Sequence, residues 1–258
     1  MSTLKIEIIP AGTDNYIYLL KDRATGLLGV VDPGAAKPVI DAMDKIGADK
    51  LDLILLTHHH EDHIAGVEEL QEKYGGTIAG PAADAHRMPP LDKALVEGDK
   101  IRIGESKGHV IETPGHTSGH ISVWFKKDGS LFCGDTLFSI GCGRMFEGSP
   151  AEMYDSLQKL ADLPDRTRIF CGHESTASNA AFAATGDPGN TRLAARMEAV
   201  EALMEDYHPT LPALMGDEKA INPFLRCDAP EIRAAVGLDE SAAPEFVFGR
   251  LRSMKDEF

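Results

Sequence analysis

The first third of the chain alternates between strand patterns and helix patterns. Polar and apolar residues alternate over residues 4–9, whereas residues 51–56 form an unbroken apolar run. Val39, Ile40, Met43 and Ile46 recur at the spacing of one helix face. The predicted strands are residues 4–9, 15–20, 27–31, 51–57 and 77–79, and the predicted helices are residues 37–47 and 64–74.

Strand signals dominate the middle of the chain, and helical spacing replaces them later. Asp128-Gly129 separates two apolar runs, as in a hairpin. The predicted strands are residues 101–103, 109–113, 121–125, 131–133 and 167–171, with a helix over residues 151–163. Helical spacing fills residues 175–207, 229–236 and 244–256, and no strand pattern returns there. We therefore expect an α+β fold with two sheets and outer helices over residues 1–174, and a helical domain over residues 175–258.

Composition places the chain among ordered globular proteins. Its 258 residues are 43% hydrophobic and 26% charged. No apolar stretch approaches twenty residues, so no membrane span is expected. Residues 1–10 alternate like a strand and lack the features of a secretory signal, which favours a cytoplasmic protein. Four cysteines show no CxxC pairing and are expected to be free, buried thiols: Cys133, Cys142, Cys171 and Cys227.

The formal charge of −15 limits the partners that the chain can bind. A nucleic-acid partner needs a basic face, and none is obvious in the sequence. The expected partner is a small molecule, with no nucleic acid, no membrane and a monomeric chain. An anionic substrate would need a local cluster of arginine and lysine near the site.

The run from Thr57 to His63 carries the strongest chemical signal. It follows the apolar run and reads His-x-His-x-Asp-His. In an extended segment His58 and His60 point to the same side, and Asp62 and His63 fall at the start of the next helix. Imidazole and carboxylate ligands suit zinc, iron or manganese better than calcium. The alternative is a solvated polar turn.

Three later strand ends carry the same residue types. His116 lies in a Pro-Gly turn, Asp135 follows Cys133-Gly134, and His173 follows Cys171-Gly172. A single histidine after a strand is more often a cap than a ligand. Four strand ends with matching residue types indicate a metal centre.

These residues resemble the metallo-β-lactamase superfamily, and other motifs resemble glyoxalase II (hydroxyacylglutathione hydrolase) within it. The narrower motifs are Asp14-Asn15-Tyr16, residues 141–148, Cys171-Gly172-His173-Glu174, Asn222-Pro223-Phe224-Leu225-Arg226 and residues 252–258. The resemblance implies a four-layer αββα sandwich followed by a helical substrate-binding domain. It also implies hydrolysis of S-(2-hydroxyacyl)glutathione, chiefly S-D-lactoylglutathione, to glutathione and D-lactate, the second step of methylglyoxal detoxification.

The same resemblance implies the ligands of two divalent ions. His58, His60 and His116 would bind one ion. Asp62, His63 and His173 would bind the other, and Asp135 would bridge both. Asp62 and Asp135 are the expected catalytic residues. Zinc is the preferred metal, with iron or manganese as alternatives, and a metal-bound hydroxide would attack the thioester carbon.

The resemblance further implies a pocket for the glutathione peptide. Its expected residues are Arg144, Phe146, Ser175, Asn179, Arg252 and Lys255. Solvated surface cations are the alternative for Arg252 and Lys255. Phe146 and Ser175 stand where the family commonly has tyrosine, which leaves the identity of the thiol open.

Other functions fit the same residues less completely, and the other histidines have no ligand pattern. A mononuclear-iron persulfide dioxygenase shares the early ligand pattern, and a β-lactamase, a nuclease or a non-catalytic metal-binding protein fits fewer motifs. His59 is expected to face away from its neighbours and His120 to support or pack rather than ligate. Asp32 could orient a ligand histidine or cap a turn.

Overall fold

The computed structural model describes residues 3–258, so Met1 and Ser2 of the predicted first strand pattern lie outside the described residues. The chain forms two compact units. The first contains the chain up to Glu112 together with Thr117–Gly134, and the second contains Thr113–His116 and Asp135–Phe258. The domain boundary expected near residue 174 does not coincide with the boundaries of these two units, and it stays a prediction.

The first unit contains a mixed sheet in the order β1-β2-β3-β4-β5-β6. Strands β1 to β3 pair antiparallel, and β3 to β6 pair parallel. The strands are β1 (Leu4–Ala11), β2 (Asn15–Asp22), β3 (Leu28–Val31), β4 (Leu53–Leu55), β5 (Thr77–Pro81) and β6 (Lys93–Leu95). Only β6, with two exposed residues of three, escaped the sequence pattern.

Alternation along these strands divides their side chains between two cores. Ile17, Val30 and Ile54 belong to a cluster with residues of α1 (Ala36–Lys45) and α3 (Val67–Tyr74). Their neighbours in sequence point to the opposite face of the sheet, because side chains alternate along a strand. Both faces are therefore buried, as the continuous apolar runs predicted.

The opposite face packs on a second group of antiparallel strands, in the order β10-β9-β8-β7. These are β7 (Lys100–Ile103), β8 (Ser106–Glu112), β9 (Ile121–Phe125) and β10 (Ser130–Gly134). The rings of Tyr18 and Phe132 meet edge to face at 5.4 Å. A Cβ on Gly29 would lie 2.8 Å from Ile103 Cδ1, so glycine allows the two sheets to approach closely here.

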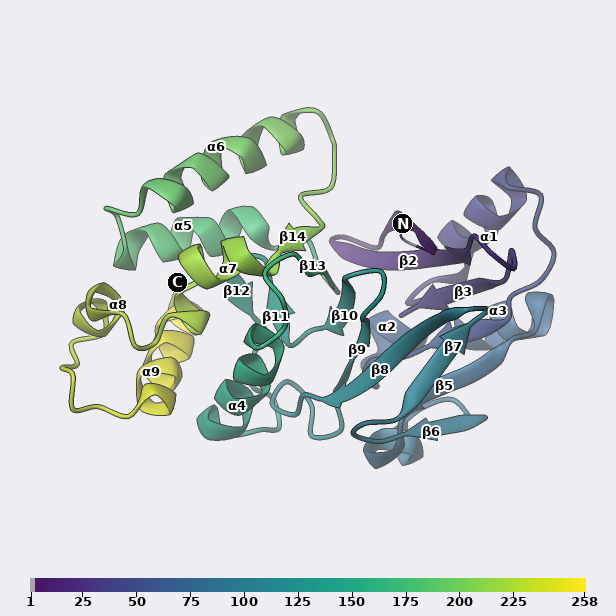
Figure 1. The fold of residues 1–258 in the computed structure, drawn as a ribbon, viewed down its shortest axis with the longest axis horizontal. Coiled ribbons are helices and arrows are strands. Elements are labelled where there is room, and N and C mark those ends of the chain that lie inside the picture. Colours follow the sequence, from purple (N-terminus) through teal and green to yellow (C-terminus); the bar gives the residue numbers. More distant parts are fainter. Residues whose placement is uncertain (1–2) are drawn as a thin grey trace. The chain divides into compact units, whose positions relative to one another are not determined.

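The second unit is mainly helical. Its helices are α4 (Pro150–Ala161), α5 (Thr176–Gly186), α6 (Thr191–Glu205), α7 (Met215–Ile221), α8 (Pro230–Ala235) and α9 (Pro244–Glu257). Helix α4 packs on α9, and α5 runs beside α6 (Figure 1). A capping box of Ser149 and Glu152 fixes the start of α4. Strands β11 (Leu137–Phe138) and β12 (Gly141–Cys142) form a hairpin.

Two sequence predictions were wrong in detail. A strand does return after residue 174, because the two residues of β14 (Ala213–Leu214) pair with β13 (Arg168–Cys171). The expected helix over residues 64–74 is two helices, α2 (Glu61–Ile64) and α3. The helical spacing predicted over residues 175–207 is confirmed by two helices, α5 and α6, and Asn190 caps α6. A two-residue strand or a break of one helical turn is too short to change the hydrophobic periodicity of the sequence, so the pattern could not predict it.

No helix among the described residues is long and apolar enough to span a bilayer.

Candidate metal centre

The histidine run lies where buried strand β4 ends and α2 begins. His60 is the N-cap residue of α2, which places Asp62 and His63 in its first turn. The ring centroid of His58 lies 4.8 Å from that of His60 and 4.2 Å from that of His63. His58 and His63 are buried, and the side chain of Asp62 is 50% exposed. Three imidazoles therefore gather at one strand end, and their roles as metal ligands stay predictions.

Asp32 fixes two of these imidazoles. Its Oδ2 accepts hydrogen bonds from Thr57 Oγ1 at 2.7 Å and from His63 Nδ1 at 3.2 Å. Because Thr57 donates its proton to Asp32, its oxygen accepts from His58 Nδ1 at 3.0 Å. This network assigns the proton to Nδ1 in both histidines and leaves each Nε2 lone pair for a metal.

These contacts decide between the two roles considered for Asp32. It is 3% exposed and has a φ of 48°, so a strained backbone turn directs its carboxylate inward. Asp32 thus orients histidines, in addition to shaping the turn.

Asn15 holds Asp62 in the same unit. Its Nδ2 donates to Asp62 Oδ2 at 2.9 Å and to the Asp62 carbonyl at 3.1 Å. Gly34 makes room for this backbone, since a Cβ there would lie 1.7 Å from the Asp62 carbonyl oxygen. Asp62 Oδ2 lies 3.5 Å from His63 Nε2. The Asp14-Asn15-Tyr16 motif therefore contributes a positioning residue.

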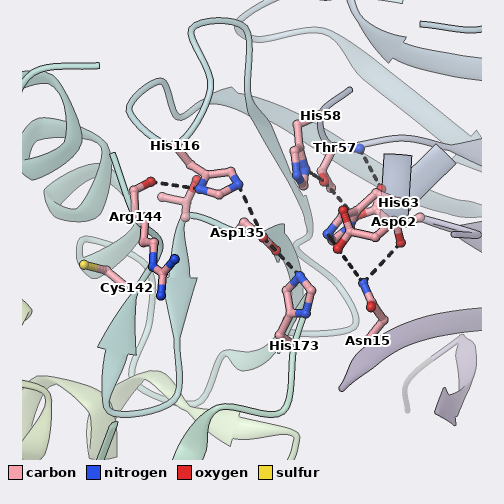
Figure 2. A network of polar contacts seen from close by, with 12 residues as sticks. Asn15, Thr57, His58, Asp62, His63, His116, Asp135, Cys142, Arg144 and His173 are labelled. Carbon is pink, nitrogen blue, oxygen red and sulfur yellow. Dashed lines mark hydrogen bonds and ion pairs between the residues drawn. The ribbon is translucent and has the colours of Figure 1, made fainter. Parts of the chain in front are cut away.

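The second unit places an aspartate between two imidazoles. Asp135 Oδ2 lies 3.4 Å from His116 Nε2 and 3.2 Å from His173 Nε2 (Figure 2). His116 Nδ1 donates to the Arg144 carbonyl at 2.8 Å, which turns Nε2 toward Asp135. A Cβ on Gly143 would lie 1.9 Å from the Asp135 carbonyl oxygen, so glycine is required there.

Each unit contributes one set of candidate ligands: His58, His60, Asp62 and His63 in the first unit, and His116, Asp135 and His173 in the second. Both ligand sets have the chemistry and spacing of metal donors. Two ligands that lie about 2.1 Å from one ion at a tetrahedral angle are about 3.4 Å apart. The three donor separations of 3.2, 3.4 and 3.5 Å fit this value. The donors are imidazole nitrogen and carboxylate oxygen, which suit zinc, iron or manganese.

A pocket of about 350 Å³ lies in the second unit. Its lining includes Phe138, whose ring lies 6.1 Å from that of His173. The pocket thus begins beside a predicted metal ligand. Its lining residues are Phe138, Cys142, Arg144, Ser175, Ser178, Asn179, Arg252, Lys255, Asp256 and Phe258. Phe146 is absent from this lining; it is 61% exposed and its ring lies 5.2 Å from that of His116.

The three cations of the pocket are held differently. Arg252 is 4% exposed and donates to the Cys142 carbonyl and to Asp256 Oδ1, both at 2.9 Å. It is therefore not the solvated surface cation of the alternative interpretation. Arg144 is 70% exposed, with its Nε 3.9 Å from the same Asp256 oxygen. Lys255 donates to Ser178 at 3.0 Å, and burial, followed by the charges of Arg252 and Arg144, lowers its pKa.

Asn179 and Ser175 lie on the wall beside these cations. Asn179 is buried and its Nδ2 donates to the Ser139 carbonyl at 3.1 Å. Ser175 is the N-cap residue of α5 but its side chain makes no capping bond. One carboxylate against three cations leaves the pocket positive within an acidic chain.

Family models cover most of the chain in two parts. The Metallo-beta-lactamase superfamily model matches residues 12–173, and the Hydroxyacylglutathione hydrolase C-terminus model matches residues 174–258. A hydroxyacylglutathione hydrolase of Rhodospirillum rubrum is 52% identical over the full length of both chains. One of Methylococcus capsulatus is 48% identical and covers 99% of each chain. The chain belongs to the hydroxyacylglutathione hydrolase family.

Solved structures confirm the α+β metallo-β-lactamase fold that the motifs predicted. The BLEG-1 B3 metallo-beta-lactamase aligns with a TM-score of 0.67 and 23% identity, over 86% of this chain and 99% of that one. ETHE1 from Myxococcus xanthus aligns with a TM-score of 0.67 and 23% identity, over 97% and 98%. TTHA1623 in a di-iron-bound form aligns at 26% identity and a TM-score of 0.56, over 65% of this chain and 92% of that one.

The family motif at Asn222 supports the hairpin between β11 and β12. Asn222 Nδ2 donates to the carbonyls of Phe138 at 3.2 Å and Gly141 at 3.0 Å. Buried Glu218 accepts from Ile140 N at 2.7 Å and from Ser139 Oγ at 3.0 Å. The sequence did not indicate a role for Glu218, because an acidic residue in a short helix is usually exposed to solvent.

The four cysteines follow their prediction, whereas His59 does not face away from His60, because their ring centroids lie 5.0 Å apart. All four cysteines are free and buried. Burial raises the pKa of Cys142 to about 11, so its thiol is not a nucleophile at neutral pH. His59 contacts buried Asp84 through Nδ1 at 3.0 Å, and His120 stacks on His58 at 4.9 Å.

Proposed function

We propose that this chain hydrolyses a thioester of glutathione, with S-D-lactoylglutathione as the main substrate. The observation that carries the proposal is the arrangement in the second unit. Phe138 joins the Asp135 ligand set to a pocket that holds three cations and one acid. A peptide with two carboxylates fits such a pocket, and the relatives that match over the full length bear the name hydroxyacylglutathione hydrolase.

The two ligand sets would together hold two divalent ions. His58, His60 and His116 are proposed for one ion. Asp62, His63 and His173 are proposed for the other, with Asp135 shared. When bound, the ions would supply Lewis acidity and water that is acidic enough to ionise near neutral pH. Zinc is the preferred metal, and the di-iron-bound form of TTHA1623 supports iron as the alternative.

The protein's own residues would position the reactants. Asp32 and Thr57 keep the Nε2 atoms of His58 and His63 deprotonated, and the Arg144 carbonyl does so for His116. Arg144 and Lys255 would hold the carboxylates of the peptide by charge-assisted hydrogen bonds. Arg252 would position the wall of the pocket through Cys142 and Asp256.

A reducing cytoplasm is the proposed compartment. All four cysteines are free thiols, as is usual for proteins in a reducing environment. We also propose that the monomer is the active form.

Turnover of S-D-lactoylglutathione, measured together with metal content, tests the proposal. Asp135→Ala removes the ligand that the two ions would share. The number of metal ions bound per chain should therefore fall below two, and kcat/KM should fall by roughly a thousandfold. Asp49→Ala, an exposed aspartate outside both ligand sets, is the matched control and should retain metal and activity. Full activity of Asp135→Ala would refute the proposal.

Oxygen uptake distinguishes the proposed thioester hydrolase from a persulfide dioxygenase. With glutathione persulfide and iron-loaded protein, no oxygen consumption is expected. Rapid oxygen consumption and one tightly bound ion, without thioester turnover, would favour the dioxygenase instead.

A further inference from the structure

A cationic face covers the outer side of strands β7 to β9. Lys100 and Arg102 alternate with Ile101 and Ile103, which are each 1% exposed. The two cations therefore point away from the core of the first unit. The register places Lys100 opposite His109 and Arg102 opposite Lys107.

The face continues across β9 to the following turn. His109 pairs with Trp124, and their rings lie 6.5 Å apart. Lys126 Nζ lies 5.7 Å from the Trp124 ring, and Lys127 follows it in the turn before β10. We name the cationic face by its seven residues: Lys100, Arg102, Lys107, His109, Trp124, Lys126 and Lys127.

The five lysine and arginine residues of this face have no carboxylate partner among residues 3–258. Other exposed cations do pair: Lys37 with Asp41, Lys50 with Asp52 and Arg192 with Asp217. The charges of Lys100, Arg102 and Lys127 lower the pKa of Lys107, so the cations repel one another. Such repulsion opposes folding and persists where a surface has another use.

Protection of an edge strand explains only part of the face. Strand β7 is the last strand in the order of its sheet, and lysines on an edge strand discourage aggregation. Lys107, Lys126 and Lys127 do not belong to β7. Cations on three neighbouring segments indicate a binding surface.

We infer that the cationic face docks an acidic segment of a partner protein. The five positive charges leave a formal charge of −20 on the rest of the chain of net −15. A long polyanion would meet that negative charge, whereas a short acidic segment meets only this face. Trp124 is half-buried and lies beside Lys126, so it is not an open platform for stacked bases. Aromatic residues and arginine are enriched at protein-binding surfaces, and Trp124 and Arg102 are such residues on this face.

Trp124 is the only tryptophan of the chain, so its fluorescence reports on this face without a label. The probe is an octaglutamate peptide, titrated into the full chain at low and high salt. We expect a change in Trp124 fluorescence with a Kd on the order of 100 µM at low salt, lost at high salt. The triple variant Lys100→Gln, Arg102→Gln, Lys107→Gln should bind about tenfold more weakly.

The matched control neutralises three paired cations, with Lys37→Gln, Lys50→Gln and Arg192→Gln. Both triple variants carry the same net charge, so the control should bind within about twofold of wild type if the location of the charge decides. Thioester turnover and Tm check that both variants are folded.

Two outcomes would overturn the inference. One is an unchanged Trp124 signal with the peptide, or equal weakening in both triple variants. The other is tighter binding of an eight-nucleotide oligodeoxythymidylate than of octaglutamate, which would assign the face to nucleic acid.

Discussion

Two cation clusters in this acidic chain are held in opposite ways. In the pocket of the second unit, Arg252 is buried and shares Asp256 with Arg144. On the cationic face of the first unit, Lys100, Arg102 and Lys107 have no carboxylate partner among the described residues. The first arrangement satisfies charge inside the protein, whereas the second leaves charge for another molecule.

Burial decides whether a charged side chain contributes to stability or to binding. Removal of a buried cation leaves its buried hydrogen-bond acceptors without a donor and destabilises the fold, although the net contribution of a buried ion pair is small. An exposed cation contributes little to stability and is available for binding. Changes in the second unit should therefore alter stability, and changes on the cationic face should alter association.

The largest effect should follow from Arg252→Met. It leaves the buried Cys142 carbonyl without its donor and removes the contact of the guanidinium with the Phe224 ring, whereas Asp256 is 43% exposed and stays solvated. The free energy of unfolding should fall by about 3 kcal/mol. Urea unfolding measures this, with Arg250→Met, an exposed neighbour on α9, as the control. A loss below about 1 kcal/mol would mean that burial of Arg252 is not what matters.

Glu218 tests the same idea with a buried acid. Burial raises its pKa from 4.5 to about 7, although Ile140, Asn222 and Ser139 donate to it. The folded protein holds this proton more tightly than the unfolded chain. Stability from this group is complete below about pH 4.5 and falls by about 3 kcal/mol as the pH rises to about 7.

Unfolding of wild type and Glu218→Gln at several pH values between 4.5 and 8 checks this. The variant should lack the decline, and Glu201→Gln, on exposed helix α6, should keep it. Parallel pH curves for wild type and Glu218→Gln would contradict the assignment.

Arg144→Ala should separate binding from stability within the pocket. Its side chain is 70% exposed, so unfolding should change little. KM for S-D-lactoylglutathione should rise about tenfold, with kcat within about twofold, because one charge-assisted hydrogen bond to the peptide is lost. Steady-state kinetics measure both, with Arg192→Ala as the control. An unchanged KM would place the peptide elsewhere.

The smallest effect concerns the stability of the cationic face. Replacing Lys100, Arg102 and Lys107 by glutamine removes repulsion and should raise Tm by about 1–2 °C. The triple replacement of Lys37, Lys50 and Arg192 removes paired cations and should leave Tm equal or slightly lower. Calorimetry compares the two, and a lower Tm for the first variant would show that these cations support the fold.

Much of the candidate site could be predicted because its signals are local. His58, His60, Asp62 and His63 lie within six residues, at a strand end that the apolar run marks. Asp135 and His173 also follow strands, and the structure places Asp135 beside His116 and His173. The choice between the two roles considered for Asp32 could not be made from sequence, since it depends on Thr57 and His63, 25 and 31 residues away.

Local patterns in the chain are enough to indicate which residues form the two cores, where the strand ends carry metal-ligand chemistry and to which family the chain belongs. Periodicity and short motifs record these features within a few residues of one another. Only the tertiary structure decided that Arg252 is buried, that Glu218 lies under the β11–β12 hairpin and that five cations share one face. These depend on the pairing register of segments far apart in the chain, which no local pattern encodes.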